Sequence, residues 1–235
     1  MPIKICSGEN ISLHITKKEL LIFDFDGTLI DSVPDLALSV NHMLTQLGYV
    51  TANEETIHTW VGNGAQTLVR RALTSQAEVF NEAHFNKALE TFLNYYAEHA
   101  CVKTTAYPNV ASTLKTLHLQ GYKMAIVTNK PFQFIEPILK GLCLDEYFDY
   151  YIGADSLEKK KPDPEPLLHV CQKLGFSVEN SLMIGDSKND IIAAKSANMH
   201  SVGVTYGYNY GEDITLYEPD IVIDDFSRMV EILSL

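Results

Sequence analysis

The sequence predicts an α/β fold: a doubly wound, mainly parallel sheet core with a helical cap domain inserted after the first core strand. Two patterns indicate it. Short apolar runs alternate with stretches of helical periodicity, which is typical of parallel strands covered by helices on both faces. One long stretch, 35–106, shows helical periodicity and no apolar run of that kind. With 235 residues, 46% of them hydrophobic, the chain is long enough to bury a large core.

The first expected strand is the apolar run Leu20–Phe23, at the start of "LLIFDFD". The later strand runs are Lys123–Asn129, Phe148–Ala154, Ser181–Ser187 and Ser201–Gly207, with Asp220–Asp225 as a candidate sixth. Helical patterns between them cover Val110–Leu119, Phe132–Gly141, Pro164–Leu174 and Asn189–Ala197. Strands separated by helices of this length predict βαβ units.

The stretch 35–106 is expected to form the helical cap, and 20–34 together with 107–235 the core. In "DLALSVNHMLTQLG" apolar residues recur at helical spacing before Gly48, a helix stop. "AQTLVRRAL" and "EAHFNKALETFLNYYAEHA" predict further helices. In the N-terminal extension, 1–19, the runs "IKIC" and "ISLHI" flank "SGEN", so a β-hairpin is expected there, with a floppy leader as the alternative.

The charge balance narrows the class of partner. The net charge is −12, from 30 acidic and 18 basic residues, which argues against nucleic acid. No apolar run reaches the length of a membrane helix or a signal peptide, and the four cysteines form no CxxC pair. A cytoplasmic protein with reduced thiols is expected. An anionic substrate would need local positive charge or a metal.

Polar residues follow the expected strands. Asp24 and Asp26 come after the first, and residues i and i+2 of a strand share a face. Parallel sheets bind ligands at the carboxyl ends of their strands, so the polar residues there should converge. The others are Thr128, Asn129, Lys161, Asp186 and Asp190.

Such a cluster suits a hard divalent cation and a phosphoryl group. Mg²⁺ prefers oxygen ligands, and a phosphoryl group in transfer needs its charge neutralised. A carboxylate can itself attack phosphorus and form an aspartyl-phosphate.

Four motifs, "DFDGTLIDS", "VTNK", "KKPDP" and "GDSKND", are similar in order and spacing to those of the haloacid dehalogenase superfamily. They span Asp24 to Asp190, most of the chain. "VGNGAQTLVRRAL" and "SVGVTYGYNYGE" resemble segments of bacterial phosphoglycolate phosphatases more closely. The resemblance implies a Rossmann-like core and a phosphomonoester hydrolase acting on a small phosphorylated metabolite, 2-phosphoglycolate.

The resemblance also implies roles for the catalytic residues. Asp24 would be the nucleophile, and Asp26 the general acid that protonates the leaving alkoxide and then activates water. Thr128 would bind the phosphoryl oxygens, and Lys161 would hold the nucleophile and the phosphate. The competing interpretation is that Thr128 only ends a strand and has no catalytic role.

Mg²⁺, with Mn²⁺ as the alternative, is the implied cofactor. Asp24, Asp186 and the backbone carbonyl of Asp26 would be its ligands. Asp190 would support them or bind as an alternative ligand. A helix start, where negative charge is favourable, is the competing interpretation of Asp190.

Substrate selection is expected to come from the cap. A Gly-flanked turn before a helix start offers backbone N–H groups to an anion such as a carboxylate. A plain helix–helix turn is the alternative, and a surface role for the neighbouring arginine is equally open. The residues expected to contact the substrate are Thr28, Gly62, Asn63, Gly64, Arg70 and Asn129.

Two other functions compete. A β-phosphoglucomutase-like phosphotransferase has the same core and cap location. A receiver-like signalling module also combines a phospho-accepting Asp, Mg²⁺ and a Lys, but receivers are about half this length and lack the insertion. Dehalogenases normally lack the second aspartate, so Asp26 argues against that activity. The sequence leaves the oligomeric state open.

Overall fold

The main sheet confirms the predicted fold class. The computed structural model describes residues 3–4, 18–76 and 79–233. Within these residues the sheet has the order β1-β9-β8-β7-β2-β5-β6, and every neighbouring pair is parallel. Its strands are β1 (Ile3–Lys4), β2 (Leu20–Phe23), β5 (Lys123–Val127), β6 (Tyr150–Ile152), β7 (Ser181–Gly185), β8 (His200–Val204) and β9 (Ile221–Ile223).

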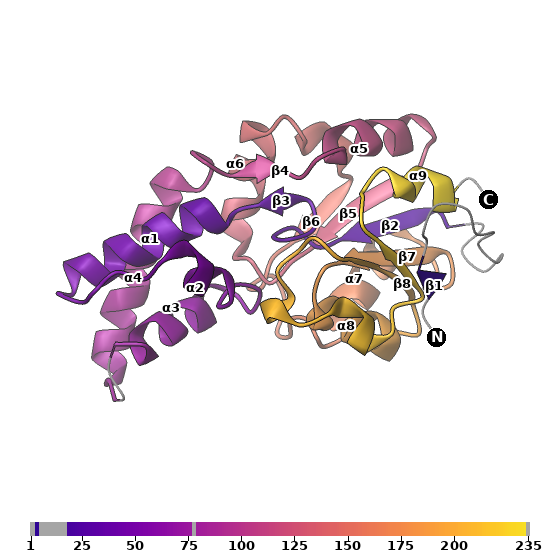
Figure 1. Ribbon diagram of the computed structural model, residues 1–235. Coiled ribbons are helices and arrows are strands. Elements are labelled where there is room, and N and C mark those ends of the chain that lie inside the picture. Colours follow the sequence, from indigo (N-terminus) through magenta and orange to yellow (C-terminus); the bar gives the residue numbers. More distant parts are fainter. Residues whose placement is uncertain (1–2, 5–17, 77–78, 234–235) are drawn as a thin grey trace.

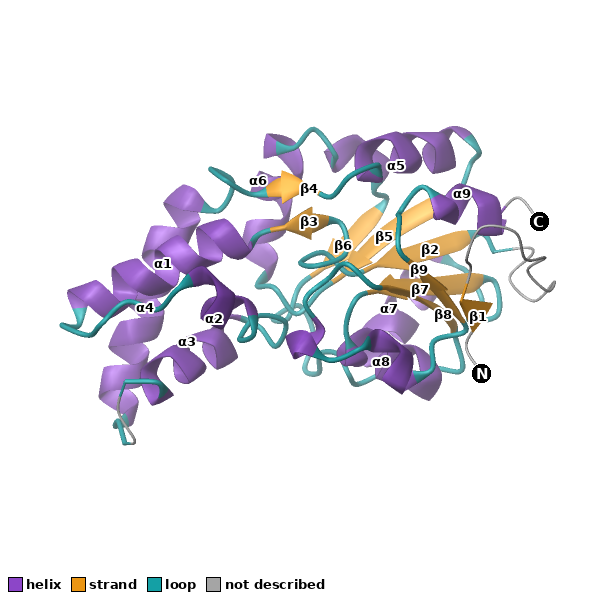
Figure 2. Ribbon diagram, in the orientation of Figure 1, coloured by secondary structure: helices purple, strands orange, loops and turns teal. Residues whose placement is uncertain are grey.

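Helices cover both faces of this sheet, and four more stand beyond its edge (Figures 1 and 2). The core helices are α5 (Val110–Leu119), α6 (Ile135–Gly141), α7 (Glu165–Leu174), α8 (Lys188–Ser196) and α9 (Arg228–Leu233). The inserted helices are α1 (Val33–Gln46), α2 (Glu54–His58), α3 (Ala65–Thr74) and α4 (Glu82–His99). Short 3₁₀ turns are η1 (Phe132–Phe134), η2 (Asp145–Tyr147), η3 (Asn209–Gly211) and η4 (Ile214–Tyr217). Among the helices of the described chain, none combines the length and the hydrophobicity needed to cross a bilayer.

The central strand shows why the strand runs are continuously apolar. In β2, Leu21 and Phe23 pack into the core cluster that includes residues of α5, while Leu20 and Ile22 pack into the cluster that includes residues of α7 and α8. All four side chains are fully buried. Because alternate residues of a strand face opposite sides, a sheet covered twice needs apolar residues at every position. The run ends at Asp24, where the chain leaves the sheet.

The strands are shorter than the sequence predicts, because the polar residues at the ends of the predicted runs lie beyond the paired segment. Two further strands were not predicted: β3 (Ile30–Asp31) and β4 (Thr105–Ala106) pair antiparallel, with Ile30 opposite Ala106. Two-residue strands carry no periodicity that a sequence pattern can detect. The hairpin expected in 1–19 falls mostly outside the described residues; Ile3–Lys4 is described and pairs in parallel with β9.

Asp35, near the start of α1, ties the two connections of the insertion together. Its carboxylate is fully buried and accepts hydrogen bonds from the backbone N–H groups of Val102, Lys103 and Thr104, at 2.8 to 3.0 Å. The Thr104 hydroxyl donates a further bond of 2.8 Å. The chain therefore enters and leaves the insertion at one place, where β3 and β4 also pair (Figure 1).

Replacing Asp35 with Ala should lower the free energy of unfolding by about 3 kcal/mol, because the two buried donors of Thr104 and the partly buried N–H groups of Val102 and Lys103 lose their acceptor. Chemical denaturation of the metal-free protein measures this. Asp145→Ala, at an exposed position, is the matched control and should change stability by less than about 0.5 kcal/mol. Equal stability of the two variants would show that water replaces the carboxylate at no cost.

Candidate active site

The position of β2 in the sheet explains why distant residues meet. It lies between β5 and β7, and Phe23 is in register with Ile126 on one side and Ile184 on the other. The residues that follow these strands therefore share one edge. Asp24 follows β2, Thr128 follows β5 and Asp186 follows β7, as the sequence pattern predicts.

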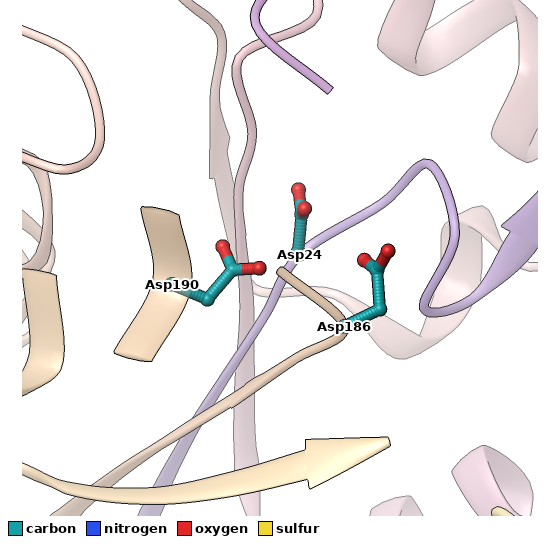
Figure 3. Close-up of side chains that lie close together, drawn as sticks. All are labelled: Asp24, Asp186 and Asp190. Atoms are coloured by element: carbon teal, nitrogen blue, oxygen red, sulfur yellow. The ribbon is translucent and has the colours of Figure 1, made fainter. Parts of the chain in front are cut away.

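Three carboxylates form the centre of this edge. Asp24, Asp186 and Asp190 each place an oxygen within 4.8 Å of the others, and all three residues are buried (Figure 3). Gly27 leaves room for one of them, Asp186. It has φ +89°, and a Cβ there would lie 2.4 Å from Asp186 Oδ2. A glycine after Asp26 is therefore required both by the backbone and by the space.

Neighbouring groups fix two of these carboxylates in place. Asp186 accepts from the Thr28 hydroxyl at 2.9 Å and from the backbone N–H of Tyr208 at 2.7 Å. Asp190 Oδ2 accepts from the backbone N–H and the hydroxyl of Ser187, at 3.0 and 2.7 Å. The bond from the backbone N–H is one half of the capping box of α8; in the other half the Ser187 side chain accepts from the Asp190 N–H. Asp190 therefore lies in the first turn of α8, as the competing interpretation expects, and also beside Asp24, Asp186 and Lys161.

The cluster is electrostatically unfavourable without a cation. Burial raises the pKa of Asp24 well above its ordinary value; Asp190 and Asp186 raise it further, while Lys161 opposes them. Burial, followed by repulsion from Asp190, raises the pKa of Asp186 to about 7. Buried, mutually repelling carboxylate oxygens are a donor set that suits a hard divalent cation such as Mg²⁺. These residues therefore fit the metal that the sequence pattern implies.

Two buried lysines supply positive charge beside the two strand-end aspartates. Lys161 Nζ lies 2.9 Å from Asp24 Oδ1 and 2.6 Å from Asp190 Oδ1. Lys130 Nζ lies 2.8 Å from Asp26 Oδ1. Burial would lower the pKa of both lysines, but the adjacent carboxylates outweigh it and raise the pKa in each case. Both are therefore ammonium groups at neutral pH.

Asp26 has partners different from those of Asp24. Besides Lys130, the Ser32 hydroxyl donates to Asp26 Oδ1 at 2.5 Å. Sequence reasoning missed Lys130 as a site residue. The available signal was its place in "VTNK", directly after two polar residues that were assigned to the site.

A cavity of about 40 Å³ opens beside Asp24 and Asp26. Core and insertion both line it: Thr128, Asn129, Lys130, Pro131 and Phe134 from the core, and Leu36, Val61, Gly62, Gly64, Ala65, Leu68, Phe92 and Tyr96 from the insertion. A substrate bound in this cavity would therefore contact both the core and the insertion.

The turn before α3 closes this cavity. The carbonyl of Gly62 accepts from the Asn129 side chain at 3.3 Å and from the Asn189 side chain at 3.2 Å. Gly64 has φ +87°, and a Cβ there would lie 2.8 Å from the Asn129 carbonyl oxygen. The Asn63 carbonyl accepts from Lys160 at 3.0 Å. The turn therefore rests directly on the core, and sequence reasoning missed Asn189 and Lys160 in this contact.

Three residues expected to contact the substrate, Thr28, Asn63 and Arg70, are not among the residues that line the cavity. The Arg70 guanidinium is 4.3 Å from the ring centroid of Phe85, on an exposed part of α3, because the next residue takes the inward position. Arg71 donates to the Trp60 carbonyl at 2.5 Å and to Asn63 Oδ1 at 2.8 Å. Thr28 is fully buried against Asp186 and is not among the residues lining the cavity.

The family model of haloacid dehalogenase-like hydrolases matches residues 21–204, and the chain belongs to this family. Among its relatives, a phosphoglycolate phosphatase of Colwellia psychrerythraea is 48% identical over 93% of this chain and 98% of its own. One of Psychrobacter arcticus is 51% identical over 92% of this chain and 96% of its own. A crystal structure described as a predicted phosphoglycolate phosphatase from Haemophilus somnus superimposes with a TM-score of 0.89 at 41% identity, covering 92% of this chain and 98% of that one.

The family match and these relatives confirm the expected superfamily and the expectation of a phosphatase. The matched family consists of hydrolases, so the match gives no support to the alternative of a receiver-like signalling module.

Proposed function

We propose that the protein hydrolyses 2-phosphoglycolate to glycolate and phosphate through an aspartyl-phosphate on Asp24. The observation that carries the chemistry is the contrast between two aspartates at one strand end. Asp24 belongs to the buried carboxylate cluster held by Lys161, whereas Asp26 lies beside it with Ser32 and Lys130. The substrate is proposed from the similarity to the phosphoglycolate phosphatases.

In the first step, Asp24 attacks phosphorus and the bond to the glycolate oxygen breaks. In the described structure, the Phe25 N–H and Lys161 both donate to Asp24 Oδ1, at 2.7 and 2.9 Å. Oδ2 is therefore the oxygen left to attack. Asp26 protonates the departing alkoxide, so that no strongly basic oxygen has to leave.

In the second step, Asp26 takes a proton from water, which attacks the phosphorus of the aspartyl-phosphate and restores the Asp24 carboxylate. Thr128, whose hydroxyl accepts from the Lys130 N–H at 3.1 Å, donates its own proton to a phosphoryl oxygen. Lys161 offsets the negative charge of the phosphoryl group.

Asp24, Asp186 and the Asp26 carbonyl would hold Mg²⁺ or Mn²⁺. The cation supplies charge that neutralises phosphoryl oxygens. Asp190, which Lys161 and Ser187 hold in place, would support these ligands or bind as an alternative ligand.

The inserted helices serve as a cap that opens for the substrate and closes over it. In the closed position the turn contacts the core through the carbonyls of Gly62 and Asn63. Gly62, Gly64 and Ala65, the first residue of α3, line the cavity. The N-terminus of a helix favours an anionic substrate.

Phosphate release should be measured with Mg²⁺ on a panel of small phosphomonoesters. We expect 2-phosphoglycolate to give the highest kcat/KM, with many turnovers per enzyme. Phosphoryl transfer to added hexose phosphate without phosphate release would identify the β-phosphoglucomutase-like alternative. A better substrate elsewhere in the panel would overturn the assignment of 2-phosphoglycolate and leave the phosphatase chemistry standing.

A further inference from the structure

One basic side chain, Lys130, is among the described residues that line the cavity. Its ammonium is 2.8 and 3.1 Å from the two oxygens of Asp26, and the side chain is 2% exposed. The other buried lysine, Lys161, is held by Asp24 and Asp190 and does not line the cavity. An anionic group placed in this cavity would therefore meet Lys130 as its cation.

Tyr96 of α4 lines the same cavity from the insertion. Its ring packs edge-to-face on Phe134 with centroids 4.8 Å apart, and Lys130 Nζ lies over the ring, 4.9 Å from the centroid. The hydroxyl is buried and makes no hydrogen bond of normal geometry in the described structure. The Lys130 ammonium interacts with its oxygen but can only donate, so the O–H itself lacks an acceptor. Burial raises the pKa of Tyr96 to about 12, so the hydroxyl keeps its proton. A buried O–H without an acceptor is costly, and a ligand oxygen would relieve that cost.

On the basis of the function proposed above, we propose that Lys130 and Tyr96 form the subsite for the carboxylate of the leaving group. Lys130 supplies the ion pair, and Tyr96 donates a hydrogen bond. Since Lys130 belongs to the core and Tyr96 to the insertion, the subsite is complete only when the two meet. Carboxylate binding thereby favours the closed form.

The remaining cavity wall explains why the carboxylate should choose this place. Beyond Asp24, Asp26 and Thr128 it includes the apolar residues Leu36, Leu68 and Phe92. At the turn before α3, the described contacts with the core are made by the carbonyl groups of Gly62 and Asn63, which would not attract a carboxylate. A second buried atom without a partner, Asn129 Oδ1, is an acceptor and would repel a carboxylate. The Asn129 amide nitrogen donates to the carbonyl groups of Gly62 and Lys161, which sets that orientation.

The test compares 2-phosphoglycolate with its amide, 2-phosphoglycolamide, which has the same shape and lacks the carboxylate charge. In Lys130→Met, the ratio of kcat/KM for the acid to kcat/KM for the amide should fall about 10- to 100-fold, the effect of losing a charged hydrogen bond. Lys140→Met, at an exposed site paired with Glu136, is the matched control and should leave the ratio unchanged.

Tyr96→Phe removes the hydroxyl and keeps the ring. It should lower the same ratio about 10-fold while the melting temperature of the free protein stays equal or rises, because a buried donor without a partner disappears. Tyr95→Phe, at the next position of α4, is the control. The Tyr95 ring stacks between His42 and His99, at 4.1 and 4.0 Å, and does not line the cavity. If Tyr96 had only a structural role, Tyr96→Phe would lower the melting temperature and would reduce kcat/KM equally for the acid and the amide. That result would overturn the role of Tyr96 in the subsite.

Equal losses on acid and amide in Lys130→Met would mean that Lys130 acts only through Asp26, and would overturn the subsite. Equal wild-type kcat/KM for the two compounds would overturn it as well. If wild type hydrolyses other phosphomonoesters but not 2-phosphoglycolate, the proposed function fails. The subsite is then tested with 3-phosphoglycerate, which has a carboxylate, and glycerol 3-phosphate, which has none. Lys130→Met should lower the ratio of their kcat/KM values, and an unchanged ratio would overturn the subsite.

Discussion

Replacing Asp24 with Asn should reduce kcat by roughly 10⁴-fold or more, because an amide cannot form the aspartyl-phosphate. The folded structure should survive. Asp24 is buried beside Asp186 and Asp190, so removing one charge lowers the repulsion in the metal-free cluster. We therefore expect a melting temperature in chelator at or above that of the wild type, together with near-complete loss of phosphate release.

Steady-state assays and thermal unfolding of the same preparation measure both effects. Asp145→Asn, at an exposed site, is the control and should retain full activity. Substantial turnover by a folded Asp24→Asn protein, verified by mass to carry the amide, would rule out Asp24 as the nucleophile.

Removing divalent cations should stop turnover completely and reversibly. Without a cation, the clustered carboxylates repel the phosphoryl group, and Lys161 is the buried charge that faces them. We expect activity to disappear in EDTA and to return when Mg²⁺ exceeds the chelator. Retained activity after exhaustive chelation, with metal content checked by elemental analysis, would contradict the metal-dependent mechanism.

The requirement for metal should depend on pH in a defined direction. Burial and Asp190 raise the pKa of Asp186 to about 7, compared with about 4 in the unfolded chain. The folded metal-free protein binds more protons between these values, so from this group its unfolding free energy falls as pH rises from about 4 to 7. Metal binding needs the ionised form, so half-maximal activation should require less Mg²⁺ at pH 8 than at pH 6. A requirement that is the same at both pH values would argue against proton release at this carboxylate.

Sequence reasoning located the centre of the site well because strand topology determines it. Asp24, Thr128 and Asp186 each follow a buried apolar run, and parallel strands bring such positions to one edge. The hydrophobic period identifies the strands, and the first polar residue after each run identifies the edge. No three-dimensional information is needed for these residues.

Residues farther from the strand ends could not be placed in this way. Helical periodicity does not show which of the adjacent residues Arg70 and Arg71 turns toward the core. The contacts of α3 decide it, since Arg71 donates to the Trp60 carbonyl and Arg70 lies over the Phe85 ring. Lys130 was overlooked because a lysine after a strand is usually exposed, and its burial depends on Asp26 and Tyr96.

The pairing of β3 with β4 has a consequence for how the chain folds. β2 must pair with β5 across a stretch of about 100 residues, which is an entropically costly loop to close. Once Ile30 pairs with Ala106, and Asp35 binds the segment around Thr104, that loop shortens to roughly 25 residues. The logarithmic dependence on loop length makes the saving about 1 kcal/mol. The short ribbon thus lets four helices interrupt the central strand pair with little delay to its formation, provided that it forms before the sheet.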